Sequence, residues 1–133
     1  EFLYHLCRSY SHQIPSASLT GSQRDLQRVT HVMNWVKVHY PEPLSLETAA
    51  DSLALSKEYF CRLFKKYTGQ TFLEYLNDVR TMHLYEDLQN SDETITVLME
   101  KNGLSNYKIF MRTFKKLYGS TPQKMRSNRI RHI

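Results

Sequence analysis

The sequence predicts an all-α protein in which two helix-turn-helix subdomains are joined by a long linker helix. Three observations predict this fold class: apolar residues recur at helical spacing along most of the chain, one basic segment occurs twice, and a short capped helix precedes each copy. A chain of 133 residues buries a modest core without disulfides or metals, which suits two small coupled subdomains. We expect about seven helices, plus an extra helix at the N-terminus.

The repeated segment reads FCRLFKKYTGQT at residues 60–71 and FMRTFKKLYGST at residues 110–121. Phe, Arg, Phe, Lys, Lys, Gly and Thr recur in the same order and at the same spacing. The apolar residues of each copy fall on one face of a helix, and Gly69 and Gly119 stand where a left-handed residue ends it. Each copy is therefore predicted to be a basic, amphipathic helix.

A shorter helix is predicted upstream of the first copy. Ser45 is placed to cap it, Ala54 and Leu55 form a tight turn, and Ser56 caps the basic helix that follows. This order of helix, short turn and second helix is typical of a helix-turn-helix unit.

The second copy has the same organisation. Thr94 is placed to cap the short helix, Gly103 supplies the turn, and Ser105 is expected to cap the basic helix. The helix-turn-helix arrangement therefore occurs twice.

The remaining apolar pattern describes a scaffold. Helical spacing predicts a helix over residues 26–40, which Pro41 and Pro43 end. A linker helix is predicted over residues 73–90, about 18 residues or roughly 27 Å long at 1.5 Å per residue. Because this helix is continuous, we expect it to hold the two subdomains at a fixed separation. Arg80 is expected to anchor it through a buried polar contact.

The predicted domain organisation has five parts. They are a remnant of an upstream region with its linker (1–24), the first helix-turn-helix subdomain (25–72), the linker helix (73–90), the second helix-turn-helix subdomain (91–126) and a basic tail (127–133). Residues 14–22 are rich in Ser, Pro and Gly, which predicts a loop after a helix near residues 1–12. Because the chain opens on Glu1, in a segment of helical character, we expect it to be a piece of a longer protein whose sensing domain is absent.

Charge is unevenly distributed along the chain, whose formal net charge is +5. Residues 56–71 carry four basic side chains against one acidic, and residues 105–126 carry six against none. The intervening residues 72–104 carry two basic side chains against seven acidic. Two basic elements flanking an acidic spacer favour a polyanionic partner held at two places.

Other classes of protein find little support in the residues. No run of about 18 apolar residues predicts membrane insertion, so we expect a cytoplasmic, nucleoid-associated protein. Cys7 and Cys61 match no zinc or redox spacing and are expected as reduced thiols, and the six histidines have no spaced partners, so neither a metal nor a cofactor is expected. Paired carboxylates, a nucleophile with its base and a phosphate-binding Gly-rich loop are missing, which argues against an enzyme.

Residues 26–126 resemble the DNA-binding domain of the AraC/XylS family. The stretches that carry the resemblance are residues 44–80 and 95–126, and the closing pattern FKK-x-x-G-x-T-P-x-x-x-R is specific. Some apolar positions depart from the family, which more often has Ala, Ala, Phe, Tyr and Tyr in place of Leu84, Met99, Leu104, Ile109 and Met125. The resemblance implies a seven-helix domain of a bacterial transcription regulator that binds, as one polypeptide, two neighbouring major-groove segments of one DNA site.

The family's base-contacting positions match Glu58, Cys61 and Arg62 on the first basic helix, on the face opposite Phe60 and Phe64. Arg62 is expected to form a bidentate pair with guanine, and Glu58 to accept a hydrogen bond from N4 of cytosine. The alternative is that Glu58 and Arg62 form an i, i+4 surface pair with each other, worth a few tenths of a kcal/mol.

The matching outer positions of the second basic helix are Tyr107, Lys108, Met111 and Arg112. Arg112 occupies the same place in its repeat as Arg62, which favours a shared role. Lys108 is expected to meet a guanine or a phosphate, and Met111 a thymine methyl group. For Tyr107 and Met111 the alternative is packing against the neighbouring unit.

Further residues near the starts of the two basic helices, or along them, are expected to contact phosphates rather than bases. They are Ser56, Lys57, Lys65, Lys66, Ser105, Lys115 and Lys116. A solvated lysine face is the alternative. Six phosphate contacts give a salt slope of about −5.

The expected partner is double-stranded DNA, with RNA polymerase as a second one. The module itself is expected to be monomeric, and the whole protein to dimerise and sense its effector through the absent N-terminal domain. A rival function is that the basic helices bind RNA or form a docking surface for a partner protein, which competition with duplex DNA would decide.

Overall fold

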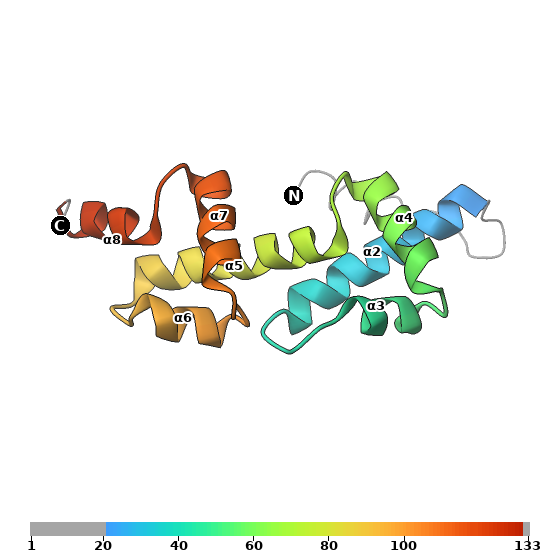
Figure 1. Ribbon diagram of the computed structural model, residues 1–133, viewed down its shortest axis with the longest axis horizontal. Coiled ribbons are helices and arrows are strands. Elements are labelled where there is room, and N and C mark those ends of the chain that lie inside the picture. Colours follow the sequence, from blue (N-terminus) through green and yellow to red (C-terminus); the bar gives the residue numbers. More distant parts are fainter. Residues whose placement is uncertain (1–20, 132–133) are drawn as a thin grey trace. The chain divides into compact units, whose positions relative to one another are not determined.

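The computed structural model of the chain describes residues 21–131, and this part is built of helices without strands, which confirms the predicted all-α fold class (Figure 1). The N-terminal extra helix lies outside the described residues. The seven helices of residues 21–131 are α2 (Gly21–His39), α3 (Leu46–Ser52), α4 (Lys57–Thr68), α5 (Phe72–Asn90), α6 (Ile95–Lys101), α7 (Tyr107–Tyr118) and α8 (Pro122–Arg131).

These helices form two compact units. Within the described residues, the first unit comprises 21–39 and 44–74, and the second comprises 40–43 and 75–131. Helix α5 therefore begins in the first unit and continues into the second. Helix α2 already starts at Gly21, so the predicted loop over residues 14–22 is wrong at its end.

The first unit is held together by an apolar core between α2, α3 and α4, with α4 packed against both other helices. Their buried side chains include Val29, Val32, Val36, Ala49, Ala50, Phe60, Leu63 and Phe64. Phe72, at the start of α5, completes the core, and its ring centroid lies 5.7 Å from that of Phe60 and 5.8 Å from that of Phe64. Full burial of each such ring contributes about 1.5–3 kcal/mol, so the phenylalanines of the repeat fix the inner face of α4.

The second unit has its own core, to which the repeat contributes Phe110 and Phe114. The buried residues are Leu84, Leu88, Leu98, Met99, Leu104, Phe110 and Phe114. The Tyr85 and Tyr118 rings stack beside it at 4.1 Å between centroids. Burial, followed by the nearby Tyr85, Glu86 and Asp78, raises the pKa of Tyr118 to about 12. This hydroxyl therefore stays neutral at physiological pH.

The first helix-turn-helix unit has the caps that the sequence predicts. The Ser45 side chain accepts a hydrogen bond from the Thr48 backbone N–H at 3.0 Å, and that of Ser56 accepts from the Tyr59 N–H at 3.1 Å. Ala54 takes a left-handed conformation, φ 56°, in the turn between the helices. A cap of this kind stabilises a helix by about 1 kcal/mol, so α4 begins at a fixed residue.

The glycine and threonine of the repeat act in sequence in both units. Gly69 (φ 79°) and Gly119 (φ 73°) end α4 and α7, and their N–H groups donate to the carbonyl oxygens four residues upstream at 2.9 and 2.8 Å. The hydroxyls of Thr71 and Thr121 then accept from the N–H groups three residues downstream at 3.1 and 3.2 Å. The G-x-T pattern thus closes one helix and opens the next.

The predicted cap of the second basic helix is wrong. Asn106, not Ser105, precedes α7, and its side-chain oxygen accepts from the Ile109 N–H at 3.0 Å. The cap follows the left-handed residue of the turn by three positions in the second unit (Gly103) and by two in the first. Ser105 is therefore an additional residue of the second turn.

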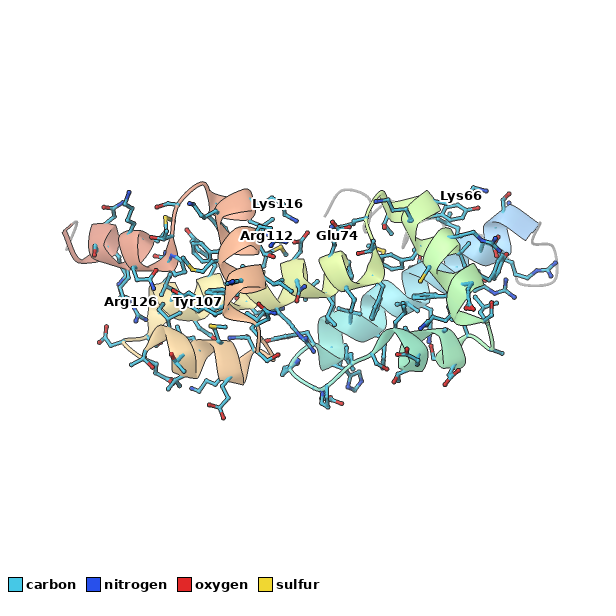
Figure 2. The ribbon with its side chains drawn as sticks, viewed as in Figure 1. Lys66, Glu74, Tyr107, Arg112, Lys116 and Arg126 are labelled. Atoms are coloured by element: carbon cyan, nitrogen blue, oxygen red, sulfur yellow. The ribbon has the colours of Figure 1, made fainter. Side chains whose placement is uncertain are left out.

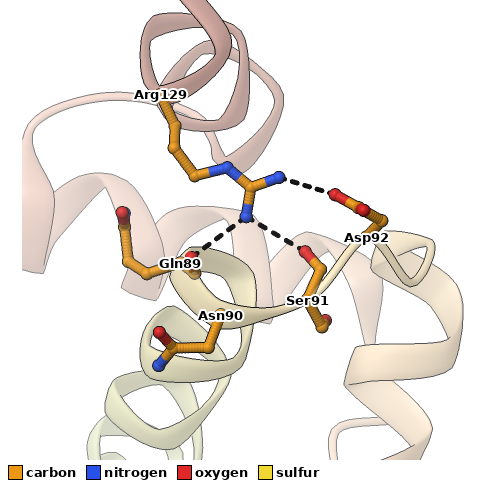
Figure 3. A pocket seen from close by; sticks show the side chains of 5 residues that line it. All are labelled: Gln89, Asn90, Ser91, Asp92 and Arg129. Atoms are coloured by element: carbon orange, nitrogen blue, oxygen red, sulfur yellow. Dashed lines mark hydrogen bonds and ion pairs between the residues drawn. The ribbon is translucent and has the colours of Figure 1, made fainter. Parts of the chain in front are cut away.

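The predicted basic tail over residues 127–133 is wrong in its first part, because α8 continues to Arg131. Arg129 donates to the carbonyl oxygens of Gln89 and Ser91, at 3.1 Å each, and pairs with Asp92 at 2.8 Å (Figure 3). It also donates to the Leu88 carbonyl at 2.7 Å. This side chain therefore caps the C-terminal end of α5 and holds α8 in place.

Arg80 anchors the linker helix through polar contacts, as the sequence predicts, but one of these contacts is only partly buried and the other is exposed. Both acceptors lie in residues 40–43. The Arg80 Nε donates to the Tyr40 carbonyl at 2.6 Å, and Nη2 donates to the Glu42 carbonyl at 2.7 Å. Burial lowers the pKa of Arg80, because desolvation disfavours the charged form. The two short hydrogen bonds offset part of that cost.

Candidate nucleic-acid interface

Helix α4 presents a polar outer face. Glu58, Cys61 and Arg62 are exposed, whereas Phe60 and Phe64 on the inner face are fully buried. The two faces follow from the helical spacing of the repeat, and the Ser56 cap fixes where the outer face begins. The structure thus brings the three predicted base-contacting residues of the first unit together on one accessible surface.

Arg62 and Glu58 do not form the surface pair considered as an alternative. In the described part of the chain, the guanidinium of Arg62 lies 6.0 Å from the ring centroid of Tyr59, and no ion pair joins it to Glu58. A guanidinium over an aromatic face keeps the hydrogen-bond donors at its edge available.

Helix α7 presents an equivalent face, on which Lys108 and Arg112 are exposed. Figure 2 shows Arg112 and Lys116 on this helix. Tyr107 is 51% exposed, and its hydroxyl accepts a hydrogen bond from the Gln123 side chain at 3.3 Å. Tyr107, Lys108 and Arg112 are therefore accessible to a partner of the second unit.

Met111 differs from its neighbours on α7. Its side chain is half-buried and packs against the apolar core of the second unit. Cys61, at the same place in the first repeat, is an exposed free thiol. The predicted contact of Met111 with a thymine methyl group thus competes with packing in its own unit.

All seven residues predicted to contact phosphates are exposed, but three lysines have partners. The Lys57 ammonium pairs with Glu47 at 3.4 Å, and that of Lys66 lies 5.4 Å from the ring centroid of Tyr67. Lys116 forms the closest of these contacts, with Nζ 2.8 Å from a carboxylate oxygen of Asp78 on α5. A phosphate that binds Lys116 must therefore displace the Asp78 carboxylate, whereas one that binds Lys66 displaces only the contact with the Tyr67 ring.

The helix ends add to the positive character of both faces. The N-terminal ends of α4 and α7 carry the partial positive charge of the helix dipole, next to Ser56 and Asn106. Lys115 and Lys116 stand in the last turn of α7, as Lys65 and Lys66 do in α4. Both faces suit an extended anion better than a small neutral ligand.

One of the basic residues counted within residues 105–126 does not lie on the outer face of α7. Arg126 donates to the Ser91 carbonyl at 3.2 Å and, with Arg129, holds α8 against the segment after α5. The high positive charge of residues 105–126 is therefore partly structural.

Sequence reasoning missed the contacts that arrange this surface. Asp78 pairs with a lysine 38 residues away, and Asp25 on α2 accepts a hydrogen bond from Tyr59, 34 residues away. The spacing of neighbouring residues in the sequence does not predict pairs that are so far apart. The cap Asn106 was within reach, because an offset of 50 residues places it opposite Ser56.

Among residues 21–131, no group of three or more His, Cys, Asp and Glu side chains is arranged to hold a metal ion. None of the helices in that range combines the length and hydropathy that crossing a bilayer requires. Cys7 lies outside the described residues.

Comparison with known proteins identifies relatives of this fold. A family model described as a helix-turn-helix domain matches residues 49–128. The transcriptional activator RhaS of Escherichia fergusonii is 31% identical over 111 residues, covering 84% of this chain and 40% of that protein. Uncharacterized HTH-type regulators of Staphylococcus aureus are 33% identical over 102 residues, and the chain spans only 14% of their length.

Two solved structures share the arrangement of helices. An AraC-type transcriptional regulator from Chromobacterium violaceum has a TM-score of 0.68 at 25% identity, covering 77% of this chain and 92% of that one. The DNA-binding domain of AdpA, solved with a target DNA, has a TM-score of 0.67 at 25% identity, covering 75% and 90%.

Proposed function

The chain belongs to the AraC/XylS family of helix-turn-helix domains, and on that premise we propose that it binds double-stranded DNA in a sequence-specific manner within a bacterial transcription regulator. One observation carries the proposal: the same capped basic helix occurs twice, each time with an arginine on the face opposite a buried phenylalanine pair. The complex of the AdpA domain with its target DNA supports the class of partner.

We assign the reading of bases to Arg62 in the first unit and Arg112 in the second, each forming a bidentate pair with guanine. Glu58, Cys61, Tyr107 and Lys108 line the same exposed faces and read neighbouring positions, and Met111 does so with the part of its side chain that remains accessible. A good bidentate pair discriminates by about 1–3 kcal/mol, roughly 5- to 150-fold in affinity. The two arginines therefore account for most of the expected specificity.

Contacts with the phosphates add affinity that does not depend on the base sequence. We assign them to Ser56, Lys57, Lys65, Lys66, Ser105, Lys115 and Lys116. Among the lysines, Lys116 contributes least because Asp78 holds it. Each lysine contact adds about 0.9 to the salt slope.

We propose that residues 25–72 and 91–126 each engage one major-groove segment and that residues 73–90 join them. The continuous helix α5 supports this organisation, because a helix transmits spacing that a flexible linker does not. Since this chain spans 40% of RhaS and 14% of the Staphylococcus aureus regulators, we propose that the whole protein has a further domain that senses the effector and dimerises it. The chain alone is monomeric, acts in the cytoplasm at the nucleoid and has RNA polymerase as a further partner.

The test is selection of preferred duplexes from a random library with the purified chain. Two short motifs are expected about one helical turn, roughly 34 Å, apart. Arg62→Ala should relax base preference in one motif and Arg112→Ala in the other. Lys101→Ala removes the same charge from α6, outside the proposed contacts, and should relax neither.

Two results contradict the proposal. One is tighter binding of RNA than of the selected duplex at the same salt concentration, which would favour the rival function. The other is an unchanged selection with both arginine variants.

A further inference from the structure

A chain of polar contacts reaches from α2 to the outer face of α4. The Tyr59 hydroxyl lies 3.3 Å from both carboxylate oxygens of Asp25. The same carboxylate pairs with Arg28, one turn further along α2, at 2.9 Å. Arg28 on the same helix thus holds the Asp25 carboxylate in place and balances its negative charge, while the carboxylate accepts a hydrogen bond from the Tyr59 hydroxyl on α4.

Tyr59 stands beneath a residue that we assign to base reading. The guanidinium carbon of Arg62 lies 6.0 Å from the Tyr59 ring centroid, within the range of a cation–π contact. Stacking of this kind uses the face of the guanidinium and leaves its N–H edge for guanine. The ring therefore restricts Arg62 without occupying its donors.

We propose that Tyr59, oriented by Asp25, is a positioning residue that pre-organises Arg62 for base reading in the first unit. The inference rests on the proposed DNA binding and adds a determinant of specificity that contacts no base itself. A side chain that is already oriented loses less conformational entropy when it binds, so its affinity for the matching base is higher.

The second unit provides an internal control. Ile109 occupies the position of Tyr59 in the repeat, so an aliphatic side chain replaces the ring three residues before Arg112. Within residues 21–131, no aromatic ring lies under Arg112. The first unit therefore holds its arginine in place and the second does not, from which we infer that the first unit reads its guanine more stringently.

The experiment measures discrimination, the ratio of affinities for the selected duplex and for the duplex with the Arg62-dependent guanine replaced. Tyr59→Ile copies the second unit and should lower this ratio about two- to fivefold, the value of an exposed cation–π contact. Tyr59→Phe keeps the ring and should lose less. The reciprocal Ile109→Tyr should raise discrimination at the other motif.

Comparison with Arg62→Ala separates this inference from the proposed function. If Arg62→Ala leaves discrimination unchanged, base reading by Arg62 fails and the proposed function fails there. If Arg62→Ala lowers discrimination but Tyr59→Ile does not, only the positioning role is overturned. The double variant should discriminate no worse than Arg62→Ala alone, whereas a further loss would show that Tyr59 acts independently of Arg62.

A second measurement needs no DNA and detects misfolding. The side-chain Hε resonance of Arg62 in the free protein should be shifted upfield by the Tyr59 ring current, and the shift should survive in Tyr59→Phe and vanish in Tyr59→Ile. Backbone amide spectra report whether each variant is folded. An Arg62 Hε shift that is equal in the wild type and in folded Tyr59→Ile would overturn the proposal.

Discussion

The two helix-turn-helix units share their inner faces and differ on their outer ones. Phe60 and Phe64 in the first unit match Phe110 and Phe114 in the second, and all four are fully buried. Outside, Tyr59 matches Ile109, and Cys61, an exposed thiol, matches Met111, which is half-buried. The repeat therefore fixes the side chains that pack each basic helix into its core. The side chains on the exposed face of each helix differ between the two units.

The units also differ at their turns and lysines. The second turn carries one residue more than the first, so α7 begins at a different distance from its short helix than α4 does. Lys116 is paired with a carboxylate, whereas its counterpart Lys66 lies by a ring. We expect the two units to make unequal contributions to binding, with the first contributing more specificity.

The largest expected effect tests whether the two cores are equivalent. Phe64→Ala and Phe114→Ala should each lower the free energy of unfolding by about 3–5 kcal/mol, because each removes a buried ring. Urea denaturation checks this, with Leu73→Ala as control, since Leu73 is 51% exposed and should cost far less. A loss below about 1 kcal/mol in either phenylalanine variant would show that its core repacks freely.

The next effect separates the turn glycine from the capping glycines. A Cβ at Gly103 would lie 2.9 Å from Arg80 Nε and 3.0 Å from the carbonyl oxygens of Tyr40 and Pro41, with φ at +81°. Gly103→Ala should cost about 3 kcal/mol, combining the left-handed conformation with crowding. Gly119→Ala has only the conformational cost, about 1 kcal/mol, since its Cβ meets nothing within 4 Å. Equal melting temperatures of the two variants would contradict the role of crowding.

A smaller effect tests the extra residue of the second turn. Asn106→Ala should destabilise the second unit by about 1 kcal/mol, because it removes the cap of α7. Ser105→Ala should change stability by less than about 0.5 kcal/mol. Thermal unfolding followed by circular dichroism measures both, and a reversed order would restore Ser105 as the cap.

The smallest effect concerns salt. Lys66→Ala should lower the salt slope of DNA binding by about 0.9, and Lys116→Ala by less, because Asp78 already neutralises Lys116. In the Asp78→Asn background, the changes in salt slope caused by Lys66→Ala and Lys116→Ala should become more similar. Titrations of DNA binding against salt concentration measure the slopes. If Lys116→Ala lowers the magnitude of the slope more than Lys66→Ala does, the proposed effect of Asp78 on Lys116 is contradicted.

Local patterns predicted the elements that the repeat encodes, including α4, α7 and the glycines that end them. Contacts between positions far apart in the sequence could not be predicted from local patterns, as the pairing of Lys116 with Asp78 across 38 residues shows. The sequence pattern did not predict that helix α8 continues through the proposed basic tail to Arg131, because this segment has no apolar periodicity. Arg129, which reaches a carbonyl 41 residues away, holds the helix instead. The outer face could be predicted as a surface, but the orientation of Arg62 depends on Tyr59 and α2.

The anchoring of Arg80 bears on how the protein can be divided. Residues 40–43 fall between two helices of the first unit, yet they belong to the second and provide the carbonyl oxygens that Arg80 binds. A single cut at the start of the linker helix would remove both carbonyl acceptors from the Arg80 guanidinium. The two units are therefore interleaved in the chain, and neither can be excised by trimming from one end.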